Sequence, residues 1–246
     1  MAAVAAMKIV AIIQARMGST RLPGKVLLPL AEKPMLQHLI ERVQRATTVQ
    51  AIRIAYPDPD SNESAPIRNL VEDLYDTGVR GYSCGSRPQE DVVGRYVDAA
   101  EFMNADLIVR IPSDNPCVEP WAIDRAVAAY LDQPCVFYSS TICNVVHRTR
   151  DYWVDGLGAE VFSMSRLKWL DEKTQGHPAW REHPHQYFYD HGVVFDHPAD
   201  VRLDVNTQAD YEFVKDIYEA LYPSNPSFGI QNILTYLDTK EVLTHA

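Results

Sequence analysis

The sequence predicts an α/β fold in which a mainly parallel, mixed sheet is flanked by helices within a single domain. Strand-like and helix-like segments alternate as far as about residue 140, their connections are short, and no repeat or low-complexity linker divides the chain. The 246 residues are 46% hydrophobic and 23% charged, which is typical of a globular protein and excludes wholesale disorder. We expect residues 1–6 to be a disordered or tag-like tail and residues 7–240 to form the domain.

Hydrophobic periodicity places the individual elements. Residues 8–14 form a continuous apolar run with β-branched side chains, which predicts a strand buried on both faces. Pro34 is expected at the first position of the next helix, because proline is favoured there. The alternation then predicts strands at 51–55, 79–83, 106–111 and 135–139 and helices at 67–74, 91–103 and 121–131. Later the pattern weakens, and we expect a strand at 156–163, a short helix at 167–173, an irregular Pro- and His-rich connection at 176–198, a strand at 201–205 and a helix at 207–222.

Charge and cysteine usage limit the kinds of partner. The formal net charge is −10, although the first 50 residues contain more basic than acidic side chains. A net acidic chain binds nucleic acid and anionic membranes poorly, whereas a local basic region suits a small anionic ligand. No stretch of 18 apolar residues is present, so no membrane-spanning helix is expected. The four cysteines show no C-x-x-C spacing, which favours reduced thiols and a cytoplasmic location.

The loop that follows the first strand contains the most informative motif. It reads Q-A-R-M-G-S-T-R-L-P-G-K over residues 14–25, with glycines at 18 and 24 and cations at Arg16, Arg21 and Lys25. Glycines allow a ligand close to the backbone, and arginine, lysine and backbone N–H groups suit a polyphosphate. The spacing differs from a Walker A loop, and Val26 stands where that loop has a metal-binding Ser or Thr. The alternative is an ordinary turn with solvated cations.

This loop closely resembles the N-terminal signature of the cytidylyltransferase family that includes spore coat polysaccharide biosynthesis proteins and acylneuraminate and ketodeoxyoctonate cytidylyltransferases. The resemblance extends from about residue 8 to residue 222. Its further segments are E-D-V-V-G-R-Y at 90–96, R-I-P-S-D-N-P at 110–116, D-G-L-G-A-E-V-F at 155–162 and Glu182-His183. It implies a Rossmann-like nucleotidyltransferase fold and attack of an acceptor oxygen on the α-phosphorus of CTP, with release of pyrophosphate.

The resemblance also implies roles for individual residues. Arg16 and Lys25 would be the catalytic cations that neutralise the triphosphate and the leaving pyrophosphate. The remaining nucleotide-binding residues would be Gln14, Ala15, Gly18, Ser19, Thr20, Arg21, Ser86 and Arg95, with the backbone at 18–20 contributing to the phosphate cradle. The acceptor would meet Glu160, Glu182, His183 and His185. Five histidines lie within residues 177–197, and we favour a loop lining the acceptor pocket over a zinc site because their spacing matches no standard ligand pattern.

A Mg²⁺ cofactor is expected, with a departure from the family pattern. Asp114 follows a buried strand, where a carboxylate suits a metal, although it could instead stabilise a turn. Family members read close to L-T-V-D-T-P-E-D where this chain has L-D-V-N-T-Q-A-D, so the usual aspartate is Asn206 and Asp204 stands two residues earlier. We expect Asp114 with Asp204, Asn206 or both to hold the ion. The alternative for Asn206 is a helix N-cap.

The expected function is transfer of CMP to an acidic sugar, amino sugar, polyol phosphate or phosphonate. One alternative is a GT-A-like glycosyltransferase, which would release a nucleoside diphosphate instead of pyrophosphate. Another is a catalytically silent nucleotide-binding regulator, suggested by Asn206. The expected partners are CTP and a small acceptor, and the resemblance implies a homodimer with residues 140–165 as a candidate interface.

Overall fold

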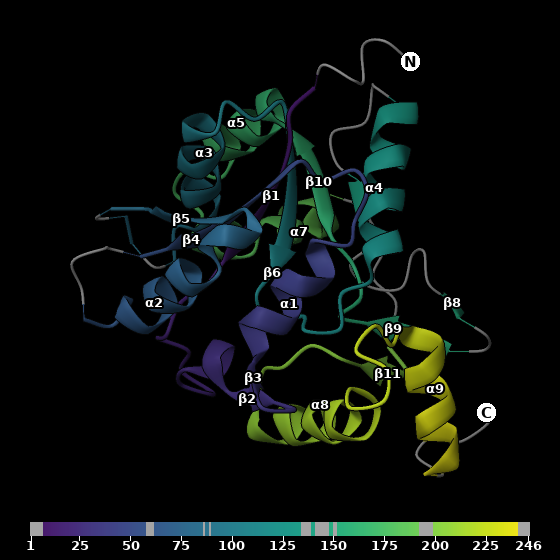
Figure 1. Cartoon of the computed structure of the whole chain (residues 1–246). Helices are drawn as coiled ribbons and strands as arrows, with labels where there is room; N and C mark the ends of the chain where they lie inside the picture. Colours follow the sequence, from purple (N-terminus) through teal and green to yellow (C-terminus); the bar gives the residue numbers. More distant parts are fainter. Residues whose placement is uncertain are drawn as a thin grey trace.

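The computed structural model describes residues 7–57, 62–85, 87–88, 90–133, 139–140, 148–149, 152–191 and 199–240. Its main sheet consists of β1 (Ile9–Gln14), β4 (Ala51–Tyr56), β5 (Val79–Ser83), β6 (Leu107–Pro112), β7 (Ser139–Ser140) and β10 (Glu160–Ser163). These strands lie in the order β5-β4-β1-β6-β10-β7, with helices on both faces (Figure 1). Strands β5, β4, β1 and β6 are parallel, and β10 runs antiparallel to both β6 and β7. The predicted α/β fold with a mixed, mainly parallel sheet is confirmed.

The core is divided by the sheet into two layers. Alternate residues of β1 point to opposite faces, so Ile9, Ala11 and Ile13 join one buried cluster while Val10 and Ile12 join the other. The first cluster is completed by α1 (Met35–Val43), α2 (Ala65–Asp73) and α4 (Pro120–Asp132). The second is completed by α3 (Val92–Phe102) and α5 (Met164–Lys173), which lie together on the other side of the sheet (Figure 1). Burial on both faces explains why β1 is apolar throughout.

A third apolar cluster lies beside the sheet. It is formed by β9 (Tyr152–Asp155), β11 (Val201–Arg202), α8 (Gln208–Leu221) and α9 (Ile230–Thr239), together with the small β2 (Pro29–Leu30) and β3 (Lys33–Pro34) hairpin. Strand β8 (Arg148–Thr149) pairs with β9. Short 3-10 helices occur at η2 (Lys25–Leu27) and η3 (Tyr75–Thr77). In the described ranges, no helix combines the length and apolar character needed to cross a membrane.

The order of the strands favours a ligand site beyond the carboxyl ends of β1 and β6. From β1 the chain moves to β4 and β5 on one side and later to β6 on the other, so the strand order reverses between β1 and β6. The last residues of these neighbours, Gln14 and Pro112, are paired in register. Open α/β sheets bind ligands beyond the carboxyl ends of strands at such a reversal. The loops after β1 and β6 therefore lie at the favoured position for a ligand.

Several sequence-based boundaries were wrong, and most errors involve proline or glycine. The connection at 176–198 contains two helices, α6 (Pro178–Glu182) and α7 (Pro184–Asp190), each begun by a proline at its first position. Pro34 is the N-cap of α1 rather than its first helical residue. The strand expected at 156–163 begins only at Glu160, and the strand expected at 201–205 ends at Arg202. Helix α9 was not predicted, and most of the strand expected at 135–139 lies outside the described residues.

Gly156 explains the first of these shortened strands and brings two distant segments together. Its φ of +86° lies in the left-handed region, and a Cβ there would come within 2.7 Å of the Asp204 backbone nitrogen. The neighbouring residues are hydrogen-bonded, since the Leu203 N–H donates to the Asp155 carbonyl at 3.1 Å. The glycine thus lets the segment before α8 approach the segment before β10.

This close approach predicts a large effect of Gly156→Ala. The variant should lose about 2–4 kcal/mol of unfolding free energy, because it combines left-handed strain with a backbone clash. Gly78 is a matched control, since its φ is +88° but a Cβ would meet nothing within 4 Å. Gly78→Ala should therefore cost only about 1–2 kcal/mol. Urea denaturation of both variants measures the difference, and equal losses would contradict the packing argument.

Candidate active site

A cavity of about 260 Å³ opens where β1 and β6 end. Its walls come from the loop after β1, the first turns of α3, the loop after β6, α6 and the segment before α8. The structure brings together twelve of the residues that the sequence assigned to the site: Gln14, Ala15, Arg16, Ser19, Thr20, Arg21, Lys25, Arg95, Asp114, Glu182, His183 and Asn206. The other cavity residues are Val26, Val92, Tyr96, Arg110, Pro112 and Ser113. Ser86 lies outside the described residues.

The loop after β1 is folded around one carbonyl group. The N–H groups of Ser19 and Gly24 both donate to the Met17 carbonyl at 2.9 Å, and Gly24 has a φ of +69° that suits a glycine. The Ser19 hydroxyl also accepts a hydrogen bond from the Leu22 N–H at 3.3 Å. The expected backbone cradle therefore needs correction, because the Ser19 amide is already used within the loop. Gly18 belongs to this loop but does not line the cavity.

Lys25 joins the three segments that meet at the cavity floor. Its Nζ donates to Asp114 Oδ2 at 3.0 Å, to the Val205 carbonyl at 2.7 Å and to Asn206 Oδ1 at 3.2 Å. The three acceptors come from the loop after β6 and from the segment before α8. All three ammonium donors are thus satisfied by oxygen atoms.

Asn206 lies at the centre of a second set of contacts. Its Oδ1 accepts from Arg21 at 2.9 Å, and its Nδ2 donates to Asp204 Oδ2 at 2.5 Å. Asn206 does not cap α8, because Thr207 is the N-cap and forms a capping box with Asp210. The helix-cap alternative for Asn206 is therefore wrong, and its amide is directed to the charged groups of the site.

Asp204 lies behind Asn206 rather than in the cavity wall. It is buried, and its Oδ1 has no hydrogen-bond partner among the described residues. Burial raises the pKa of this carboxyl, and the neighbouring carboxylates of Asp155 and Asp114 act in the same direction, while Arg202 opposes them. Asp204 and Asn206 do lie together, as expected, although the regular strand ends before them.

The oxygen atoms around Lys25 are of the kinds that bind Mg²⁺. They comprise a carboxylate, an amide oxygen and a backbone carbonyl, with the Asp204 carboxylate directly behind. The described residues contain no group of three or more His, Cys, Asp and Glu side chains placed for a metal. Mg²⁺ is usually held by one or two carboxylates together with substrate phosphates and waters. The residues present therefore fit Mg²⁺ bound jointly with a phosphate ligand.

Two further contacts hold the upper walls of the cavity. Arg95 donates to Gln14 Oε1 at 2.8 Å through Nη2, and Gln14 Nε2 donates to the Val92 carbonyl at 2.8 Å, so α3 is fixed to the end of β1. On the opposite wall, Arg16 Nη2 forms an ion pair with Glu182 Oε1 at 3.1 Å. This pair joins the loop after β1 to α6. Both arginines line the cavity.

Arg110 is a cavity residue that the sequence reasoning missed. It interrupts the apolar run of β6, and its partner in the antiparallel register is Glu160 on β10, with Nη1 and Oε1 2.7 Å apart. A single arginine within a buried strand was the available signal. Burial alone would raise the pKa of Glu160, but the positive charge of Arg110 and the contact with His185 outweigh it and hold the pKa below its usual value.

The structure corrects the expectation that Glu160 and His185 meet the acceptor directly. Glu160 has no exposed surface, and neither residue lines the cavity. His185 Nδ1 lies 3.5 Å from Glu160 Oε1. Glu160 therefore acts on the cavity through Arg110, which it orients and neutralises.

Two further histidines of this region are packed against aromatic rings. His177 lies 4.1 Å from Trp180, and His191 stacks on Tyr187 at 4.1 Å between ring centroids. His183 alone among the described histidines lines the cavity. Burial lowers the pKa of its imidazole, although nearby Glu182 opposes this effect. His197 lies outside the described residues.

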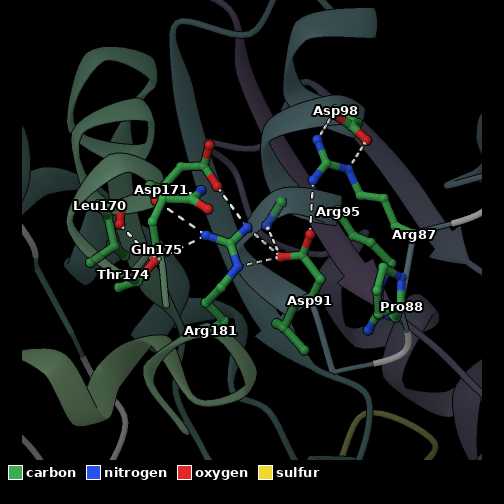
Figure 2. A network of polar contacts seen from close by, with 12 residues as sticks. Arg87, Pro88, Asp91, Arg95, Asp98, Leu170, Asp171, Thr174, Gln175 and Arg181 are labelled. Atoms are coloured by element: carbon green, nitrogen blue, oxygen red, sulfur yellow. Dashed lines mark hydrogen bonds and ion pairs between the residues drawn. The ribbon is translucent and has the colours of Figure 1, made fainter. Parts of the chain in front are cut away.

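Helix α6 is fixed in place by Arg181, which lies between two carboxylates (Figure 2). Its Nε donates to Asp91 Oδ1 at 2.8 Å, and its Nη2 donates to Asp171 Oδ1 at 2.8 Å. Nη1 completes the set with the Asp171 carbonyl and the Thr174 hydroxyl. Because Asp91 is the N-cap of α3, this network joins the helices that carry Arg95 and Glu182. The two cavity walls are therefore held as one unit.

Removing the Arg181 guanidinium should destabilise the protein. We expect Arg181→Met to lower the unfolding free energy by about 2–3 kcal/mol, because two poorly exposed carboxylates lose charged donors. Lys168→Met is the control, since Lys168 forms a half-exposed ion pair with Glu101. Such exposed pairs contribute little, so the control should change stability much less. If chemical denaturation gave the same loss of unfolding free energy for both variants, the Arg181 network would stabilise the protein no more than an exposed ion pair does.

The pH dependence of stability should report the charge of Asp91. Burial favours the neutral acid, but hydrogen bonds from two arginines and a backbone N–H outweigh it and hold the pKa of Asp91 below its ordinary value. Its ionised form therefore stabilises the fold above the unfolded-state pKa of about 3.9, and this contribution is lost as the pH falls through the lower folded-state pKa.

Asp91→Asn separates this charge from helix capping. Asparagine still accepts a hydrogen bond at an N-cap, so the variant loses mainly the charge. The difference in unfolding free energy between wild type and Asp91→Asn should be about 1–3 kcal/mol at pH 7 and should shrink below about pH 4. Urea titrations across this range test it, and a difference independent of pH would contradict the assignment.

Comparison with known proteins agrees with this geometry. A family model described as cytidylyltransferase matches residues 10–240. A spore coat polysaccharide biosynthesis protein of Bacillus subtilis is 29% identical over 237 residues, covering 92% of both chains. A 3-deoxy-manno-octulosonate cytidylyltransferase of Trichlorobacter lovleyi is 31% identical over 216 residues, covering 78% of this chain and 79% of the relative.

Solved structures show the same fold. A cytidylyltransferase from Leptospira borgpetersenii superposes with a TM-score of 0.79 at 26% identity, covering 98% of this chain and 99% of its own. A CMP:2-keto-3-deoxy-manno-octonic acid synthetase complexed with CTP superposes with a TM-score of 0.63 at 20% identity, covering 87% and 99%. The family model spans almost the whole described domain, from β1 to α9. The chain therefore belongs to the cytidylyltransferase family, whose members are nucleotidyltransferases.

Proposed function

We propose that the protein transfers CMP from CTP to a small anionic or sugar acceptor, releases pyrophosphate and uses Mg²⁺ as its cofactor. The observation that carries the proposal is the charge of the cavity. Among the described residues, five cations line it, Arg16, Arg21, Lys25, Arg95 and Arg110, against two carboxylates, Asp114 and Glu182. Even with Arg110 paired to Glu160 outside the cavity lining, the cations remain in excess. Such an excess of cations favours a highly charged anion, and a triphosphate is more anionic than a diphosphate.

The relatives support the choice of nucleotide and of reaction. Two of them are described as 3-deoxy-manno-octulosonate cytidylyltransferase or the corresponding CMP synthetase, and one of these was solved with CTP. Family membership favours nucleotidyl transfer over a glycosyltransferase activity. For this chain, the choice of CTP as donor is supported by that likeness and by the excess of cations in the cavity lining.

The proposed reaction is a displacement at phosphorus. The acceptor oxygen forms a bond to the α-phosphorus of CTP, and the bond from that phosphorus to the oxygen bridging to the β-phosphorus breaks. A hydroxyl acceptor would pass its proton to water in this step, whereas an anionic acceptor oxygen has no proton to lose. The leaving pyrophosphate keeps the electron pair. Phosphoryl transfer depends mainly on positioning and charge neutralisation. Arg16 and Lys25 would supply this neutralisation at the β- and γ-phosphates, each exchanging an internal carboxylate partner for phosphate oxygens.

The metal would lie on the oxygen atoms at the cavity floor. The Asp114 carboxylate and the Asn206 amide oxygen would bind it directly, and Asp204 would hold Asn206 in place through their hydrogen bond. When bound with the nucleotide, Mg²⁺ would supply positive charge that offsets the negative charge of the phosphates. Asn206 contributes a ligand without adding negative charge.

The acceptor would approach between Arg110, Glu182 and His183, which line the cavity together. Of the expected acceptors, an acidic sugar, a polyol phosphate and a phosphonate carry an anionic group that fits a wall with an arginine held in place by a buried glutamate. An amino sugar would rely on Glu182 instead. An anionic phosphate or phosphonate oxygen is already nucleophilic near neutral pH, so such an acceptor needs no general base. Homodimer formation through residues 140–165 stays a prediction, since part of that segment lies outside the described residues. The cytoplasmic location also stays a prediction.

Thermal stability with nucleotides tests the donor without knowledge of the acceptor. The protein should be stabilised selectively by CTP over UTP, ATP and GTP, and more strongly with Mg²⁺. A ligand at 100 times its dissociation constant stabilises the native state by about 2.7 kcal/mol. Pyrophosphate release is then measured with candidate acceptors. Stabilisation by another nucleotide would overturn the choice of CTP, and binding of CTP without pyrophosphate release from any acceptor class would favour a silent regulator.

A further inference from the structure

The Lys25 ammonium is surrounded by oxygen atoms of the kinds that bind divalent metal ions. Its three contacts are a carboxylate oxygen of Asp114, a side-chain amide oxygen of Asn206 and the carbonyl oxygen of Val205, at 2.7 to 3.2 Å. Only 12% of the Lys25 side chain is exposed. Carboxylate, amide and carbonyl oxygens are the ligands of hard divalent cations. The ammonium therefore stands among the atoms that fit Mg²⁺.

The charges around Lys25 oppose the binding of a divalent ion to the protein alone. Asp114 and Lys25 form an ion pair, and Asn206 adds no charge where the family pattern has an aspartate. The second cation nearby, Arg21, is also directed to Asn206 Oδ1. A divalent ion entering this group would face two resident cations and only one carboxylate in direct contact. Electrostatic repulsion therefore opposes its binding to the protein alone.

We propose that Lys25 is a tethered cation that occupies the divalent-metal position and excludes the metal until an anionic ligand draws the ammonium away. The four-carbon side chain is flexible, and Lys25 already lines the cavity, so its ammonium can turn toward a ligand there. The proposed function enters only in identifying that ligand as a nucleoside triphosphate. Metal would then enter together with the nucleotide, whose charge replaces the repulsion with attraction.

Binding of Mn²⁺ in the absence of any nucleotide tests the proposal. Mn²⁺ replaces Mg²⁺ at oxygen sites, and the free ion is counted by electron paramagnetic resonance. Wild type should bind Mn²⁺ weakly. Lys25→Met keeps the length of the side chain but removes the charge, so it should bind Mn²⁺ about tenfold or more tightly than wild type. Mn²⁺ should also raise the melting temperature of this variant but not that of wild type.

Lys33→Met is the matched control. Lys33 also forms a part-buried ion pair, with Glu41 at 2.8 Å, and it lies in the β2–β3 hairpin outside the cavity lining. Its loss should leave Mn²⁺ affinity unchanged. If Lys25→Met folds poorly, Lys25→Gln repeats the test, because its amide still donates two hydrogen bonds to the oxygens without a charge.

The outcomes separate this proposal from the proposed function. Equal Mn²⁺ affinity in wild type and both Lys25 variants would overturn the proposal for Lys25. It would also be overturned if Lys33→Met bound Mn²⁺ as tightly as the Lys25 variants do. Tight Mn²⁺ binding confined to the Lys25 variants supports it, whatever nucleotide the protein uses. In a separate arm, CTP should promote Mn²⁺ binding to wild type, and failure there counts against CTP as the ligand while the nucleotide-free comparison still decides the role of Lys25.

Discussion

The ammonium group of Lys25 is the point at which three distant parts of the chain meet. Residue 25 ends the loop after β1, Asp114 follows β6, and residues 205 and 206 precede α8. Apart from the short helix η2, which begins at Lys25, the contacting residues lie outside helices and strands. Their relative positions therefore depend on this contact and on the strands behind them. The rest of the cavity is built around this floor. A single charged side chain thus links the sheet to the third apolar cluster.

The site resolves an apparent conflict between an acidic protein and an anionic ligand. The chain carries a net charge of −10, yet cations predominate in the cavity. Three of the cations are paired with carboxylates: Arg16 with Glu182 and Lys25 with Asp114 within the cavity, and Arg110 with Glu160 outside its lining. These carboxylates neutralise the cations while no ligand is bound, which limits repulsion among them. A phosphate ligand can then replace carboxylate oxygens with its own.

The walls of the cavity are supported from outside it. Glu160 holds Arg110 from beneath, and Asp91 joins α3 to α6 through Arg181. Neither carboxylate lines the cavity. Precise positioning of charged groups requires such partners, because long cationic side chains otherwise retain many rotamers. Much of the charge in the sequence motifs therefore serves the geometry of a few groups that line the cavity.

The sequence by itself determined the fold class, most helices and strands of the first half and twelve residues that gather at the cavity. Local patterns sufficed for the helices, the strands and the loop after β1, because a strand buried on both faces, a glycine-containing loop and an amphipathic helix each leave a mark within a short window. The roles of the site residues came mostly from the family resemblance. The family resemblance then located the remaining motifs.

Only the tertiary structure decided which of the predicted site residues line the cavity. Glu160 and His185 were assigned to the acceptor, but the antiparallel register of β10 against β6 places Glu160 beneath Arg110. The short helices at 178–190 and the close approach at Gly156 were missed for a related reason, since proline and glycine signals do not show what the chain packs against. Contacts between residues more than a hundred positions apart, such as Lys25 with Asn206, are set by the packing of whole elements and leave no local pattern.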